Sequence, residues 1–189
     1  MKNYLTKLKK AYKFAEEFMQ DHTNRDYHNF RHAKDVAHSA LRLSDGENVG
    51  YQKRFELITA ALLHDLIVEP YNKDNEERSV EIARELLPQI GYSPKEVKNV
   101  TKLILATKVP TKPSNKIERI ICDADVDNLG REDFLERGEE VRKELNIPQE
   151  GWYQTQINFL KNHKYYTKTA KKLRNEGLQK NIAELERRL

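Results

Sequence analysis

Histidine and aspartate residues stand at the ends of three apolar segments of this chain. The pair His64-Asp65 closes a continuous apolar run, and a later apolar segment ends in Asp123 and Asp125. His32 stands at the start of another segment with helical spacing. A buried imidazole or carboxylate needs hydrogen bonds or a cation. Divalent transition metals accept ligands of both types. We therefore predict that these segments meet at one metal ion.

Neighbouring residues at a helix end can bind the same ion. Successive side chains of an α-helix point ~100° apart, so His64 and Asp65 can both reach an ion beside the end of their helix. For an isolated pair, hydrogen bonds to nearby backbone are the simpler interpretation. His32, Asp123 and Asp125 also stand at the ends of apolar segments, which favours a shared metal ion over backbone hydrogen bonds.

The elements that must position these residues are helices. Seven glycines and six prolines are few for an all-β protein of this length. Apolar residues recur every three or four positions, which predicts an all-α fold. With short links between them, roughly nine helices form a helical orthogonal bundle rather than an up-down four-helix bundle. Their expected ranges are about 3–20, 32–43, 55–68, 79–90, 93–107, 117–129, 131–145, 152–163 and 169–189.

Length and composition favour one domain without a membrane segment. A chain of 189 residues with 38% hydrophobic residues can bury one core, so we expect a single domain over 1–189. No apolar run approaches the ~20 residues of a membrane span, and the first residues lack the apolar core of a signal peptide. The single cysteine, Cys122, suits a reducing compartment. We expect a cytoplasmic protein with no membrane partner.

The net charge of +4 suits a small anionic partner. Much of the basic excess lies in the last third of the chain, where a solvated helix face is the simpler interpretation. No aromatic residues interleave with it, so a nucleic acid is not the expected partner. The helix at 169–189 is amphipathic and packs either internally or against a second chain, which leaves a homodimer open.

The order of the histidines and aspartates is similar to that of a known family. His32, His64-Asp65 and Asp125 resemble the signature of the HD superfamily of metal-dependent phosphohydrolases. The stretch Tyr27 to Ala33 resembles the Tyr-His-Asn-x-x-His-Ala motif that is also found in cyclic-nucleotide phosphodiesterases. Asp123-Ala124-Asp125 resembles the Asp-Ala-Asp of many bacterial members, in which the second aspartate binds the metal. The similarity covers roughly residues 5–189 and is greatest to a branch of short, predicted HD phosphohydrolases of undefined substrate.

This resemblance implies a single HD-type domain and a ligand set. The metal-binding core is expected at about 27–130, with the helices of 131–189 packed on it. His32, His64, Asp65 and Asp125 would hold one divalent transition metal: manganese, iron, cobalt, nickel or zinc. No later histidine pair follows to complete a second site, so a second ion, such as magnesium or manganese, would bind weakly through Asp65.

The resemblance also implies catalytic roles for His28 and Asp65. The metal bound by Asp65 would lower the pKa of a water molecule, and the resulting hydroxide would attack phosphorus. His28 would donate a proton to the leaving oxygen. Asp123 points away from Asp125 on a helix, and we expect it to accept a hydrogen bond from His32 or His64.

Charged residues in two loops are further candidates. Glu76 and Glu77 would orient the water or a second ion, with capping of the next helix as an equal alternative. Arg31, Lys108 and Lys112 are candidate phosphate ligands, because they lie in loops near the predicted metal, and a plain surface position is the alternative for each.

Three functions fit these features. The first is hydrolysis of a phosphomonoester or phosphoanhydride bond of a small nucleotide. The second is a cyclic-nucleotide or cyclic-oligonucleotide phosphodiesterase, suggested by Tyr27 to Ala33. The third is a non-catalytic module that binds a metal or a nucleotide. A purely structural zinc site would be rich in cysteine, and Cys122 stands alone.

Overall fold

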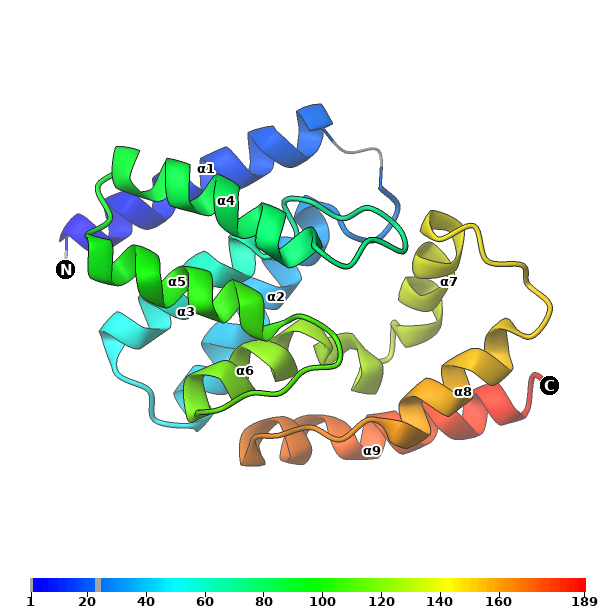
Figure 1. Ribbon diagram of the computed structural model, residues 1–189. Coiled ribbons are helices and arrows are strands. Elements are labelled where there is room, and N and C mark those ends of the chain that lie inside the picture. The colour runs from blue at the N-terminus through cyan, green and yellow to red at the C-terminus, as the bar shows by residue number, and fades with distance from the viewer. Residues whose placement is uncertain (1, 23–24) are drawn as a thin grey trace.

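The computed structural model describes residues 2–22 and 25–189 and contains helices and no strands within them (Figure 1). The all-α prediction is confirmed. The helices are α1 (Lys2–His22), α2 (Phe30–Gly46), α3 (Tyr51–Leu63), α4 (Asn75–Gln89), α5 (Pro94–Ala106), α6 (Lys116–Asp125), α7 (Phe134–Glu144), α8 (Trp152–Asn162) and α9 (Lys168–Glu186), with a 3₁₀ turn, η1 (Asp127–Gly130), after α6. Among these helices, none is both long and apolar enough to span a bilayer.

Helix α2 is longer than the sequence pattern predicted. It starts at Phe30 because the side chain of Asn29 accepts hydrogen bonds from the backbone N–H groups of Arg31 and His32. The helix also continues past its predicted end at residue 43 and ends at Gly46. His32 is therefore in the first turn of α2, on its buried side.

Helix α3 ends earlier than predicted, at Leu63 rather than near residue 68. The guanidinium of Arg25 donates to the carbonyl oxygens of Asp65 and Leu66, at 3.1 and 2.9 Å, and so satisfies acceptors that the helix would otherwise bond. The hydroxyl of Ser79 accepts from the backbone N–H of Ile67 at 3.0 Å. The early end places His64 and Asp65 at the helix terminus.

Helices α2 and α3 form the centre of the molecule. Helix α2 packs along α3 and α6, and α3 also contacts α1 and α5. Alanine residues make these contacts close, because Ala33, Ala40, Ala60 and Ala61 are fully buried. In Figure 1, α7 and α8 stand to one side of helices α1 to α6.

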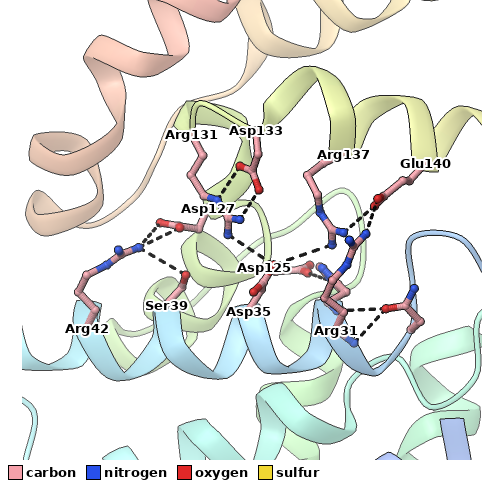
Figure 2. A network of polar contacts seen from close by, with 12 residues as sticks. Arg31, Asp35, Ser39, Arg42, Asp125, Asp127, Arg131, Asp133, Arg137 and Glu140 are labelled. Carbon is pink, nitrogen blue, oxygen red and sulfur yellow. Dashed lines mark hydrogen bonds and ion pairs between the residues drawn. The ribbon is translucent and has the colours of Figure 1, made fainter. Parts of the chain in front are cut away.

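The C-terminal helix packs within the chain. Helix α9 contacts α8 and crosses η1 so closely that a Cβ atom at Gly177 would lie 2.1 Å from the carbonyl oxygen of Gly130. The buried carboxylate of Asp127 in η1 accepts hydrogen bonds from Arg42 of α2, seen in Figure 2, and from Arg174 of α9. These contacts attach α9 to the helix that bears His32.

Candidate metal centre and adjoining pocket

Four predicted ligands converge from three helix ends. His32 comes from the start of α2, His64 and Asp65 from the end of α3, and Asp125 from the last residue of α6. The Nε2 atom of His64 lies 3.1 Å from both Asp65 Oδ2 and Asp125 Oδ1. His32 Nε2 lies 3.4 and 3.2 Å from the same two oxygens. One donor atom from each residue therefore faces a common point, within 4.8 Å of the other three.

These distances fit a metal ion. Nitrogen and oxygen ligands bind divalent transition metals at about 2.1 Å, which separates neighbouring donor atoms by roughly 3.0 to 3.4 Å in octahedral or tetrahedral arrangements. The Nδ1–H of His64 donates to the carbonyl oxygen of Ala61 at 2.9 Å, which leaves Nε2 free to bind the ion. The residues present therefore fit a divalent cation.

The electrostatics of the cluster also favour a cation. Burial by itself would lower the pKa of His64, but the carboxylates of Asp65 and Asp125 raise it well above its ordinary value. Burial would likewise raise the pKa of Asp125, but His64 and His32 hold it at about 2. Two half-buried carboxylates thus favour positive charge at this point, and a metal ion would supply it.

The expectation that Asp123 hydrogen-bonds a ligating histidine is wrong. Its buried carboxylate accepts hydrogen bonds from the backbone N–H groups of Tyr166 and Thr167, at 2.8 and 2.7 Å, and from the hydroxyl of Thr167 at 2.7 Å. Residues two apart on a helix face nearly opposite directions, so Asp123 points to the segment before α9 while Asp125 points to the centre. The partner of His64 is the backbone of Ala61.

His28 is held by Glu144, a residue that no sequence pattern singled out. The Oε1 atom of Glu144, at the end of α7, accepts a hydrogen bond from Nδ1 of His28 at 2.5 Å. Its Oε2 atom accepts from the backbone N–H groups of Tyr27 and His28, at 2.8 and 2.9 Å. Burial raises the pKa of Glu144, but these hydrogen bonds, led by that of His28, lower it overall. Glu144 therefore fixes the imidazole and leaves Nε2 for a ligand.

The acidic candidates lie in the first turn of α4. Glu76 is half-buried, and its pKa is raised mainly by burial and further by the charge of Asp65. Glu77 forms an ion pair with Lys108. Lys112 is exposed and, with Lys108, lines a surface groove. The roles proposed for these residues stay predictions.

Arg31 pairs with α7 (Figure 2). Its guanidinium contacts Glu140, which also accepts from Arg137 at 2.5 Å. Arg137 also lies 3.9 Å from Asp35 of α2. These ion pairs attach α7 to α2, the helix of His32. A phosphate contact by Arg31 stays a prediction.

A pocket of about 430 Å³ opens beside the metal centre. His28, His32 and Asp125 line one part of it, and α7 and α8 line the other. The α7 and α8 side is mostly apolar, with Val141, Leu145, Trp152 and Phe159 among its residues. Size and composition are typical of sites that bind small organic molecules.

Comparison with known proteins identifies the family. The profile of the HD domain family matches residues 29–128, which is more than half of the chain and contains all four predicted ligands. This chain belongs to the HD domain family. Among curated proteins, no sequence matches it significantly.

Solved structures share the fold over nearly the whole chain. The crystal structure of Bacillus subtilis YpgQ in complex with ADP superposes with a TM-score of 0.72 at 19% identity, over 99% of this chain and 97% of that one. A predicted HD superfamily hydrolase from an uncultured Thermotogales bacterium gives a TM-score of 0.65 at 21% identity, over 95% and 89% of the two chains. The chain therefore has the fold of HD superfamily hydrolases.

Proposed function

We propose that this protein hydrolyses a phosphomonoester or phosphoanhydride bond of a small nucleotide and requires a divalent metal ion. The observation that carries the proposal is the cluster of four converging donor atoms, of whose residues His32 and Asp125 also line a ligand-sized pocket. His28, fixed by Glu144, lines the same pocket. The presence of ADP in the YpgQ complex supports a nucleotide as the ligand class.

The residues of the site divide the chemistry between them. His32, His64, Asp65 and Asp125 would hold the ion, and when bound it would lower the pKa of a water molecule and offset negative charge on the phosphoryl oxygens. His28 holds a proton at Nε2 that passes to the leaving oxygen as the bond from phosphorus to oxygen breaks. Glu144 is a positioning residue, because it acts only through His28. We propose that Glu76, in the first turn of α4, orients the attacking water, since the charge of Asp65 raises its pKa.

A cyclic-nucleotide phosphodiesterase is the second candidate. It is supported by the stretch Tyr27 to Ala33, in which His28 has a carboxylate partner and His32 belongs to the metal cluster. Both reactions need the same ion and the same proton donor, so the substrate panel must decide between them.

The test is release of phosphate or nucleoside from linear and cyclic nucleotides. Chelator-treated protein would be assayed with manganese, cobalt, nickel or magnesium, beside Asp65→Ala and the matched control Asp74→Ala, which changes an exposed aspartate of the following loop. We expect metal-dependent turnover that is lost only in Asp65→Ala. Turnover restricted to cyclic substrates would select the phosphodiesterase. No turnover by metal-loaded protein would favour a binding module.

A further inference from the structure

A largely buried glutamine side chain at the pocket has no hydrogen-bond partner in the described structure. Gln156 of α8 is only 6% exposed, and it lies between this pocket and a second hollow beside Glu136 and Arg188, lining both. No hydrogen bond joins its amide to any residue within 2–22 or 25–189. Its amide oxygen and nitrogen are not completely buried, so both can still bond water or a ligand that enters the pocket. Gln156 is therefore poised to bond a ligand.

The environment of Gln156 suits a flat aromatic ligand. Trp152 lies one turn before it on the same helix, and Phe134 and Val141 line the same pocket from α7. Apolar and aromatic walls favour stacking of a planar ring. A carboxamide offers a donor and an acceptor side by side, which matches the hydrogen-bonding edges of nucleobases.

Glycine at position 138 leaves room for the end of the Gln156 side chain. A Cβ atom at Gly138 of α7 would lie 2.1 Å from Nε2 of Gln156. Any larger residue there would displace the end of the Gln156 side chain. Gly138 itself lines the pocket, so α7 and α8 meet at the carboxamide.

We propose that Gln156 reads the base of the nucleotide by paired hydrogen bonds and determines which base the site prefers. This inference rests on the proposed function, because the phosphates of the same molecule would lie at the metal centre. The base would occupy the part of the pocket between α7 and α8, with Gln156 at its edge.

The test is binding to the manganese-loaded protein. The probes are the α,β-methylene analogues of ADP, GDP, CDP and UDP, and methylenediphosphonate as a base-free probe. Calorimetry gives affinities, and fluorescence of Trp152, the chain's single tryptophan, reports occupancy of the pocket. The variants are Gln156→Leu and Gly138→Ala, and Gln154→Leu is the matched control, since Gln154 is exposed on the same helix.

We expect the wild type to prefer one base over the poorest by about tenfold or more, as paired hydrogen bonds to a base provide. Gln156→Leu and Gly138→Ala should each reduce this ratio to about threefold or less, with affinity for methylenediphosphonate unchanged. Gln154→Leu should keep the wild-type order. Because Gly138→Ala only adds a methyl group, it tests the inference if Gln156→Leu does not fold.

Three results would overturn the inference, and they differ in what they imply for the proposed function. Wild-type base ratios in Gln156→Leu or Gly138→Ala, or nucleotide affinities equal to that of methylenediphosphonate, would overturn the role of Gln156 alone. Failure of the wild-type protein to bind any of the five probes would overturn both the inference and the nucleotide as ligand.

Discussion

Replacement of Glu144 by glutamine should separate the positioning of His28 from the binding of the metal. The carboxylate is 5% exposed and accepts three hydrogen bonds, two from the backbone and one from the imidazole. A glutamine oxygen can keep the two backbone bonds, but its amino group would face Nδ1 of His28. The variant therefore loses one charge-assisted hydrogen bond, worth about 1.5 to 3 kcal/mol. Alanine would lose all three and cost more.

The catalytic effect should exceed the effect on stability. General acid catalysis contributes about 10²- to 10⁴-fold, and a mispositioned acid should lose a large part of it. We expect Glu144→Gln to lower kcat about 100-fold with unchanged metal content. Turnover with the preferred nucleotide, elemental analysis and denaturant unfolding would be measured on the same preparation.

A double variant of His28 and Glu144 tests whether Glu144 acts only through His28. If Glu144 acts only through His28, adding Glu144→Gln to His28→Ala should cause little further loss of kcat. The pH profile of kcat should lose the same limb in both single variants. Wild-type turnover in Glu144→Gln, or independent losses that multiply in the double variant, would refute the role of Glu144.

Two further predictions concern stability. Glu96→Gln should lower the free energy of unfolding by about 3 kcal/mol at pH 7, because it leaves Lys7, whose Nζ lies 2.9 Å from Glu96, buried without its partner. Burial opposes ionisation of Glu96, but hydrogen bonds from Ser93 and Lys7 lower its pKa below the ordinary 4.5. The difference in the free energy of unfolding between wild type and Glu96→Gln should therefore shrink as the pH falls below 4.5. A constant difference in urea unfolding from pH 7 to 3 would contradict this. Asp123→Asn should lower stability by about 2 kcal/mol, since it disturbs three buried hydrogen bonds, and keep one metal ion per chain. Loss of the metal in the elemental analysis would show that Asp123 does serve the metal centre.

The sequence predicts the metal centre because each ligand has a local signal. Polar ligands at the ends of apolar helices indicate a metal site without knowledge of the fold. The order of His32, His64, Asp65 and Asp125 in addition indicates the HD family. The all-α fold follows for a similar reason, since helical periodicity is local. Helix ends were less predictable. Helix α3 stops at Leu63 partly because Arg25, nearly 40 positions earlier, bonds carbonyl oxygens beyond it.

Glu144 and Gln156 had no such signal. Glu144 lies 116 residues after His28, within a charged helix whose other acidic residues have similar surroundings in the sequence. Gln156 becomes significant only because α7 and α8 enclose it beside the metal centre. Asp123 was misassigned because its partners, Tyr166 and Thr167, come from a segment that the sequence does not place near α6.

Titration of chelator-treated protein with manganese, with free Mn²⁺ followed by electron paramagnetic resonance, tests the proposed metal centre. The wild type, His32→Ala and Asp65→Ala would be compared with His38→Ala, which changes an exposed histidine of the same helix. We predict one tight site per chain in the wild type and in His38→Ala, and no tight site in His32→Ala or Asp65→Ala, with all four proteins helical by circular dichroism. Tight stoichiometric binding in either ligand variant, or none in the wild type, would contradict the assignment.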